Sequence, residues 1–217
     1  MIDRIALAAC LALSGGGALA TTPALSGDTG YAPQPGDSPR EIVATHSGLV
    51  LRTLVEQRDQ FRADPDALET FVKREFRKVF DREYSARLVL GRHGRGLSEP
   101  ELVEFAEALA DNLIVRYGRA LLDFDPHIDV KVVAETPVRD GKMVRVSTEV
   151  LRRGGPPVPV AYVFHQDKDT WRVFDVIVEG VSYVQTYRNQ FEEMLREQTV
   201  AEVTRKLRKG EVDARTQ

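Results

Sequence analysis

The spacing of apolar residues changes along the chain and separates helical from extended regions. From Ser38 to about Leu122, apolar side chains recur at helical intervals, which predicts amphipathic helices. From residue 128 to residue 179 they alternate with polar side chains, which predicts β-strands. From residue 182 to residue 209 the helical spacing returns, so we expect two further helices that meet near Gln198.

Capping residues mark where several of these helices begin and end. Residues 38–41, Ser-Pro-Arg-Glu, form a capping box with proline at the first helical position. Residues 64–66, Asp-Pro-Asp, open a second helix, and Ser98 with Glu101 opens the long one. A short helix over residues 84–90 is expected to end at Gly91, a residue suited to a left-handed helix end.

The alternating region predicts four antiparallel strands with one apolar face. Asp140-Gly141 is a hairpin signal, and residues 154–157 and 167–170 form the next two connections. The apolar face of the second and third strands is expected to carry Val144, Val146, Thr148, Val150, Val158, Val160, Tyr162 and Phe164. Helices, then an antiparallel sheet, then helices predict an α+β fold: a curved four-stranded sheet wrapped by helices, which can leave an apolar cavity between the layers.

Four segments are expected along the chain. Residues 1–20 resemble a secretory signal peptide, because a short apolar run precedes the small-x-small site Ala18-Leu19-Ala20. Residues 21–37 are rich in Pro, Gly, Ser and Thr, which predicts a flexible leader. Residues 38–209 form the folded domain and residues 210–217 a polar tail. We therefore expect an exported protein that is cleaved after about Ala20.

Cys10 is the only cysteine of the chain, and it lies within the expected signal. Residues 7–10, Leu-Ala-Ala-Cys, resemble a lipoprotein signal box, so lipidation of Cys10 is the alternative to cleavage after Ala20. The apolar segment before this box is shorter than an ordinary signal core, which favours cleavage. The mature chain would then contain no cysteine for a disulfide, a thiol nucleophile or a thiolate metal site.

Charge argues against a nucleic-acid-binding protein. The chain carries 30 basic and 33 acidic residues, a formal charge of −3, whereas nucleic-acid-binding domains are usually basic overall. Residues 73–95 are the exception, with eight basic and three acidic residues. This stretch is typical of a solvated helix face, and the alternative is a patch that meets lipid phosphates or an acidic partner.

The residues that could carry catalysis are few and scattered. None of the four histidines, His46, His93, His127 and His165, has the helical spacing of a metal-ligand pair. Alternation places His165 on the solvated face of its strand, and His46 falls on the apolar stripe of the first helix. Alternation also places Asp175 on the same face as Trp171, Val173 and Ile177, where it would be a general base or, more simply, a strand carboxylate that pairs with an arginine or caps a backbone amide.

Two runs of residues carry a family resemblance. The first is Leu88-Val89-Leu90-Gly91-Arg92-His93, followed by residues 98–105 and by Tyr117-Gly118-Arg119-Ala120-Leu121. The second and more specific run is Asp175-Val176-Ile177-Val178-Glu179-Gly180-Val181-Ser182, which leads into Tyr187-Arg188-Asn189-Gln190-Phe191. Both resemble the MlaC family of phospholipid-binding proteins, also called the toluene-tolerance family, and the similarity spans about residues 40–209.

The resemblance implies a fold and a function. The fold would be a curved sheet of the nuclear-transport-factor or cystatin-like type with added helices. The function would be a periplasmic shuttle that carries phospholipid between an outer-membrane lipoprotein complex and an inner-membrane ABC transporter with a ring-shaped lipid-binding subunit. It implies neither a catalytic residue nor a cofactor nor a metal. Two alternatives stay open: a hopanoid-associated carrier of the same family, and an exported enzyme on a similar sheet that uses Asp175 or His165.

A lipid carrier needs an apolar interior, and the sequence suggests which residues line it. Composition alone is typical of an ordinary core, so only the resemblance points to a cavity. We expect the cavity between the sheet and the preceding helices, lined by Phe76, Phe80, Phe105, Leu109, Val144, Val146, Tyr162 and Phe164.

Overall fold

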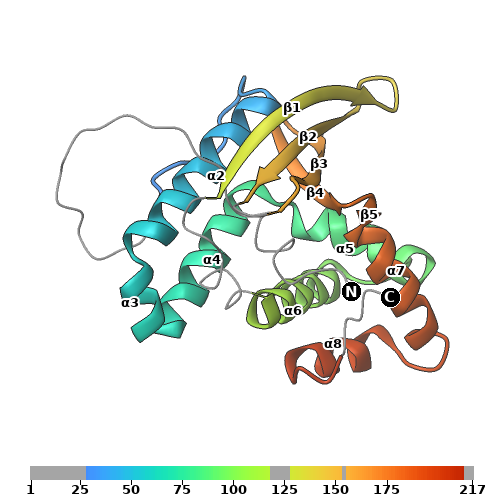
Figure 1. Ribbon diagram of the computed structural model, residues 1–217. Helices are drawn as coiled ribbons and strands as arrows, with labels where there is room; N and C mark the ends of the chain where they lie inside the picture. The colour runs from blue at the N-terminus through green and yellow to red at the C-terminus, as the bar shows by residue number, and fades with distance from the viewer. Residues whose placement is uncertain (1–27, 118–127, 153–154, 213–217) are drawn as a thin grey trace.

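The computed structural model describes residues 28–117, 128–152 and 155–212 (Figure 1). Several expected features lie outside the described residues. They are the signal peptide with Cys10, the first part of the leader, the helix end near Leu122, His127 and the last five residues. Among the residues that are described, no helix has both the length and the apolar character needed to cross a membrane.

The first half of the described chain is helical, and its helices begin where the capping residues indicate. The Ser38–Glu41 capping box is present, and the Asp64 carboxylate accepts hydrogen bonds from the backbone amides of Asp66 and Ala67. Gly91 follows its helix with a φ of 52°, a conformation that favours glycine. The elements are α2 (Pro39–Glu56), α3 (Arg58–Ala63), α4 (Pro65–Val79), α5 (Arg82–Leu90), the 3₁₀ helix η1 (Gly91–Gly94) and α6 (Glu99–Tyr117).

The second half forms one antiparallel sheet followed by two helices. The strands pair in chain order, and a two-residue fifth strand extends the four that the sequence predicts. The first hairpin connection spans residues 139–142 rather than two residues, with positive φ at Arg139, Asp140 and Gly141. The elements are β1 (Asp129–Val138), β2 (Met143–Leu151), β3 (Val158–Asp167), β4 (Thr170–Val178), β5 (Val181–Ser182), α7 (Tyr183–Met194) and α8 (Val200–Arg208).

A β-bulge in β4 changes which residues share a face. Val163 pairs with Asp175, but its neighbour Phe164 pairs with Val173, so Phe174 is an extra residue in β4. One inserted residue reverses the alternation, because successive side chains of a strand point to opposite faces. The expectation that Asp175 shares a face with Trp171 and Val173 is therefore wrong.

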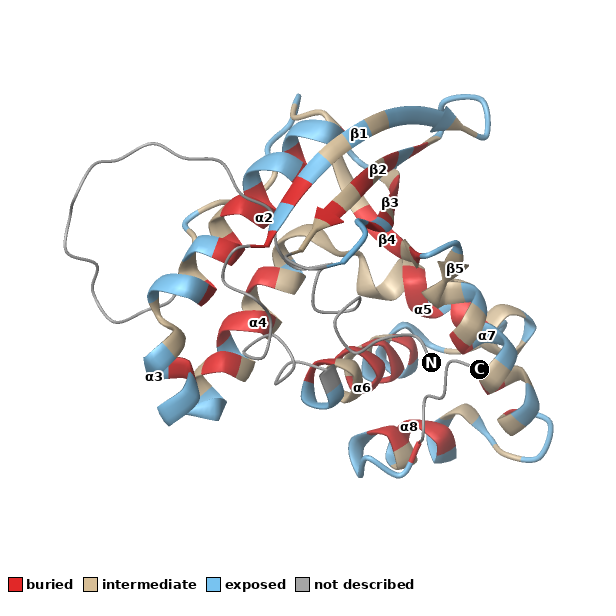
Figure 2. Cartoon of the chain, viewed as in Figure 1, coloured by how far each residue is buried: buried red, intermediate tan, exposed pale blue. Residues whose placement is uncertain are grey.

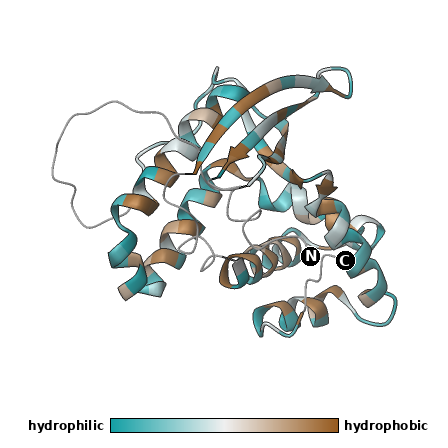
Figure 3. Cartoon of the chain, in the orientation of Figure 1, coloured by the Kyte–Doolittle hydropathy of each residue, from teal (hydrophilic) through white to brown (hydrophobic). Residues whose placement is uncertain are grey.

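Two apolar clusters form the interior. The first, here called the sheet cluster, joins α2, α3, α4 and Ile114 of α6 to one face of β1–β4, and Figure 2 shows the buried segments of these helices and strands. Val146 and Phe164 are fully buried in it. The second, the helix cluster, joins α5, α6, α7 and α8, and Figure 3 shows the hydrophobic residues along α6. In it Phe105 of α6 meets Phe191 of α7 edge to face at 5.5 Å. Tyr183, at the start of α7, packs against both clusters.

Candidate functional site

Eight side chains are expected to line a cavity, and in the structure they are distributed over the two clusters. Six of them belong to the sheet cluster or pack against it: Phe76, Phe80, Val144, Val146, Tyr162 and Phe164. The other two, Phe105 and Leu109 on α6, belong to the helix cluster. An amphipathic stripe shows that one side of α6 is buried but not against which partner, and this stripe packs against α5, α7 and α8.

The margin of the sheet cluster is aromatic and incompletely covered. Phe76 and Phe80 stack with ring centroids 4.3 Å apart, and both are only partly buried. Trp171 and Tyr183 pack against the same cluster and are also partly buried. Partly exposed aromatic rings at the edge of an apolar cluster leave apolar surface in contact with solvent.

A polar pocket of about 380 Å³ lies where α4, α5 and the β3–β4 hairpin meet, and we call it the arginine pocket. Phe80, from the margin of the sheet cluster, forms part of its wall. The remaining lining residues are Arg77, Asp81, Arg82, Glu83, Tyr84, Arg87, His165, Asp167 and Arg172.

Asp81 and His165 form a hydrogen-bonded pair in this pocket. His165 Nε2 lies 2.8 Å from Asp81 Oδ2, and the His165 side chain is only 13% exposed. The His165 ring stacks on Tyr84, with centroids 4.0 Å apart and planes 12° from parallel. Burial opposes ionisation of Asp81, but hydrogen bonds from His165 and from the Tyr84 amide outweigh it and hold the pKa of Asp81 below its ordinary value.

The expected solvated position of His165 is wrong, and the reason is a long-range contact. The backbone amide of Asp81 donates to the carbonyl of Val173 at 2.7 Å, so the start of α5 is fixed beside the sheet edge. The Asp81 carboxylate, which caps α5, therefore reaches the outward face of the neighbouring strand. Asp81 and His165 lie 84 positions apart in the sequence, so no local sequence pattern predicts their contact.

Arg172 anchors one wall of the pocket. Its guanidinium donates from Nη2 to the backbone carbonyl oxygens of Arg77 at 3.1 Å and Phe80 at 2.9 Å, which are exposed at the end of α4. Its Nε is buried and has no hydrogen-bond partner among the described residues. Arg77 and Arg82 both face the carboxylate of Glu107, at 4.0 and 3.6 Å.

A second hollow, of about 440 Å³, lies on α4 and is lined by Thr70 and by four basic side chains: Lys73, Arg74, Arg77 and Lys78. Arg77 belongs to both hollows, so the two adjoin at this side chain, and six of the eight basic residues of the stretch noted in the sequence line one or both of them. Neither hollow is the apolar cavity expected from the sequence, which stays a prediction.

A buried carboxylate, Glu75, lies on the inner side of α4 and is fully excluded from solvent. It accepts hydrogen bonds from Thr29 Oγ1 at 2.6 Å and from Lys78 Nζ at 2.9 Å, and its Oε2 lies 3.3 Å from His46 Nε2. Burial favours the neutral acid, but the interactions with His46, Thr29 and Lys78 outweigh it and lower the pKa of Glu75 to about 2. Thr29 belongs to the segment expected to be a flexible leader, and this contact ties it to the domain.

Sequence reasoning missed Glu75, although a signal was present. Glu75 follows Phe71 by four residues and Val72 by three, so it falls on the apolar stripe of α4. A carboxylate at such a position needs buried partners, because an isolated buried charge is too costly to keep. His46 is buried on the apolar stripe of α2, as expected, and supplies one of these partners.

Asp175 is a structural cap. Ser182 Oγ donates to its Oδ2 at 2.6 Å, and the Val184 amide donates to its Oδ1 at 3.0 Å. Burial raises the pKa of Asp175 above its ordinary value, although these hydrogen bonds act in the opposite direction. Of the alternatives weighed from the sequence, capping of a backbone amide describes Asp175 as it stands in the structure.

The described part of the chain offers no cluster of metal-ligating side chains. Over residues 28–117, 128–152 and 155–212, no three His, Cys, Asp or Glu side chains come together in an arrangement that could hold a metal ion.

The fold and the site define the class of this protein. It is an α+β protein in which helices wrap one antiparallel sheet, with an aromatic margin beside a polar pocket. The family model described as MlaC protein matches residues 45–209, which include every element from α3 to α8. The chain therefore belongs to the MlaC family.

Individual relatives agree with this assignment. The toluene tolerance protein ttg2D of Pseudomonas putida is 25% identical over 157 residues, which are 71% of this chain and 71% of that protein. The intermembrane phospholipid transport system binding protein MlaC of Haemophilus influenzae is 19% identical over 152 residues, which are 68% of this chain and 70% of that protein.

A solved structure shares the fold. The phospholipid-binding protein from Ralstonia solanacearum, solved in complex with a phospholipid, superposes with a TM-score of 0.58 at 21% sequence identity. The match covers 74% of this chain and 93% of that chain.

Proposed function

We propose that this protein is a periplasmic phospholipid carrier. The observation that carries the proposal is the family match, which spans the sheet and the helices around it. One similar protein is named as the binding protein of an intermembrane phospholipid transport system, and another is described as phospholipid-binding and was solved with a phospholipid. In the pathway that the family resemblance implies, the carrier moves lipid between an outer-membrane lipoprotein complex and an inner-membrane ABC transporter with a ring-shaped lipid-binding subunit.

The physical need for a carrier follows from the cost of exposing acyl chains to water. Two chains of a phospholipid contain about 30 methylenes, and each costs about 0.8 kcal/mol to expose, so free transfer would cost about 24 kcal/mol. A protein lowers this cost by surrounding the chains with apolar side chains, without any directional bond to them. The sheet cluster supplies such side chains on the face of β2 and β3.

The aromatic margin of the sheet cluster is where the chains would enter. Val146 and Phe164 are fully buried by the protein's own side chains, so hydrocarbon would have to displace or part the helices that cover them. Phe80, Trp171 and Tyr183 are partly buried at the edge of the same cluster, and they offer the first apolar contacts. On this proposal α2 shifts away from the sheet when lipid is loaded, while the end of α4 stays bound to β4 through Arg172.

Native mass spectrometry of the exported protein, purified without detergent, tests the proposal directly. We expect a bound mass of phospholipid size, released on denaturation. A bound mass of hopanoid size would identify the other carrier of the family. Protein that repeatedly arrives free of lipid, and takes up none from vesicles, would count against a carrier of either kind.

A matched pair of variants links binding to the margin. Trp171→Ala removes an aromatic ring from the margin of the sheet cluster. Val133→Ala removes an apolar side chain of β1 that is 50% exposed. We expect the first variant to retain less lipid than the wild type and the second to match it. The enzyme alternative is tested with Asp175→Asn and His165→Asn. Loss of a turnover that the wild type shows, with lipid retention unchanged, would favour that alternative.

Transfer itself needs a separate assay. A fluorescent phospholipid loaded into the purified protein should reach the purified inner-membrane transporter faster than it reaches plain vesicles. Equal rates to both acceptors would leave a lipid-binding protein without a docking-dependent shuttle role.

A further inference from the structure

The arginine pocket adjoins the apolar interior through a single shared side chain. Phe80 lines the pocket and also packs against the sheet cluster, where it stacks on Phe76. A ligand with hydrocarbon at the cluster margin therefore has a polar pocket one aromatic ring away. This is the arrangement that an amphiphile needs, because its polar and apolar parts are covalently joined.

The arginines of the pocket have the chemistry of a phosphate site. A guanidinium presents a planar fork of donors that matches the oxygens of a phosphate group. Arg172 is held in place by two backbone carbonyl oxygens, and its buried Nε has no partner among the described residues. Arg77 and Arg82 approach Glu107 only at 4.0 and 3.6 Å, so their guanidinium groups remain able to turn toward a ligand.

The balance of charge in the lining selects among phosphate compounds. Four arginines face three carboxylates there, and one of these, Asp81, is already hydrogen-bonded to His165. The two others, Glu83 and Asp167, would repel a doubly charged phosphate monoester. A phosphodiester carries one negative charge and is repelled less, which matters because Glu107 and Glu99, outside the lining, also pair with Arg77, Arg82 and Arg87. The stacked rings of Tyr84 and His165 provide a rigid wall against which such a group can pack.

We propose that the arginine pocket binds a phosphodiester group, with Arg77, Arg82 and Arg172 as its donors. In the loaded carrier this group is the headgroup phosphate of the lipid, whose chains lie beyond Phe80. The assignment of this phosphate to a carried lipid rests on the proposed function. A small water-soluble phosphodiester has the same chemistry and would occupy the same pocket.

The first experiment tests the pocket without any lipid chain. Glycerophosphoethanolamine, a soluble phosphodiester, is titrated into the full-length protein while the His165 ring signals are followed by NMR at constant ionic strength. We expect saturable shifts of these signals, and equal concentrations of uncharged glycerol should leave them unchanged. The expected shifts should be lost in Arg82→Gln and retained in Arg208→Gln. The second variant removes a surface arginine of α8 that pairs with Glu104 of α6 at 3.4 Å.

The second experiment asks whether the bound lipid uses the pocket. Competitive loading compares a phospholipid with the diacylglycerol of the same chains, so that only the phosphate-bearing headgroup differs. A charge-assisted contact on this phosphate should give the wild type a preference of about tenfold or more for phospholipid. The double variant Arg77→Gln/Arg82→Gln should lose most of this preference. Glu107→Gln, which frees both arginines, should keep or increase it.

The outcomes separate this inference from the proposed function. If neither phospholipid nor diacylglycerol binds, the carrier function fails. If both bind, the variants show the wild-type preference and glycerophosphoethanolamine shifts nothing, the carrier function stands and the phosphodiester site is overturned. If the soluble phosphodiester binds but the double variant keeps the preference for phospholipid over diacylglycerol, the pocket does bind phosphodiesters. The phosphate of the carried lipid is then rejected as the group that occupies it. Arg172→Gln is not used, because loss of its backbone contacts would disturb the end of α4.

Discussion

The buried carboxylate of Glu75 allows a stability prediction with a definite size and pH dependence. Its pKa falls from an ordinary value of 4.5 to about 2 in the folded protein. A depressed carboxyl pKa stabilises the fold at pH values above the unfolded pKa, and the stabilisation is lost as pH falls toward the folded pKa. The shift corresponds to about 3 kcal/mol at neutral pH, and this contribution should disappear between about pH 4.5 and pH 2.

The perturbation is Glu75→Gln, which keeps the shape of the side chain and removes its charge. Lys78 then loses a 2.9 Å ion pair and His46 its 3.3 Å neighbour. We expect the variant to be less stable than the wild type by about 3 kcal/mol at pH 7. The difference should narrow to under about 1 kcal/mol as pH approaches 2, because the wild-type carboxylate is then losing its charge as well.

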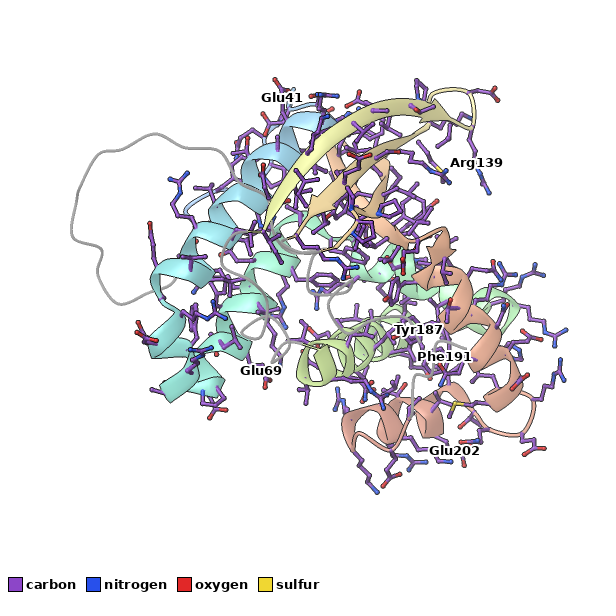
Figure 4. All side chains as sticks on the ribbon, in the orientation of Figure 1. Glu41, Glu69, Arg139, Tyr187, Phe191 and Glu202 are labelled. Atoms are coloured by element: carbon purple, nitrogen blue, oxygen red, sulfur yellow. The ribbon has the colours of Figure 1, made fainter. Side chains whose placement is uncertain are left out.

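Urea denaturation followed by the fluorescence of Trp171, the single tryptophan, measures the free energy of unfolding at each pH. Other carboxylates titrate in the same range, so the difference between variant and wild type isolates Glu75. Glu69→Gln is the matched control on the same helix: Glu69 is 37% exposed and pairs with Lys73 at 2.8 Å (Figure 4 labels Glu69). It should cost about 0.5 kcal/mol or less. A Glu75→Gln deficit that stays constant from neutral pH to about pH 3 would refute the reasoning.

Three further substitutions probe the fold, each measured by the urea midpoint and slope. Ser182→Ala removes both the cap of α7 and a 2.6 Å hydrogen bond to Asp175, and should cost about 1–2 kcal/mol; a neutral result would mean that water replaces the hydroxyl. Phe164→Ala removes a fully buried ring and should cost about 3–5 kcal/mol, unless the sheet cluster collapses onto the space. Gly91→Ala should cost about 1 kcal/mol or more, because φ is +52° and the new Cβ would lie 3.3 Å from the Arg188 guanidinium; unchanged stability would show that this turn relaxes.

The helix starts could be predicted because capping is local. Ser38, Asp64 and Ser98 each lie within three residues of the groups that they bond, and those bonds are present. The strand faces of β2 and β3 could also be predicted, since regular alternation runs through both. Val144, Val146, Tyr162 and Phe164 are all buried on one face.

The sequence could not predict which helices share a cluster, or where alternation breaks. Phe105 lies on a clear apolar stripe, yet the stripe does not say whether it meets the sheet or α7. Asp175 is placed on the opposite face by one extra residue at Phe174, and a single insertion leaves no mark on composition. The pairing of Asp81 with His165 depends on the packing of α5 against β4, which is a property of the whole fold.

Strand β4 joins the two clusters through polar bonds, and this explains how one part of the molecule could move while the other stays fixed. Ser85 of α5 donates to the Phe174 carbonyl at 2.6 Å, and Asp175 caps the first turn of α7, so both helices are oriented on β4 by directional hydrogen bonds. The polar contacts described between α2 and the sheet lie at its first turn, where the Arg40 amide donates to Glu135 at 2.9 Å. Along the rest of α2, its buried side chains meet the sheet through apolar packing. Apolar contacts have no required direction, so acyl chains can replace them in kind. The end of α4, by contrast, is tied to β4 by the two hydrogen bonds of Arg172, so for a lipid carrier separation of α2 from the sheet costs less than separation of α4, α5 or α7 from β4.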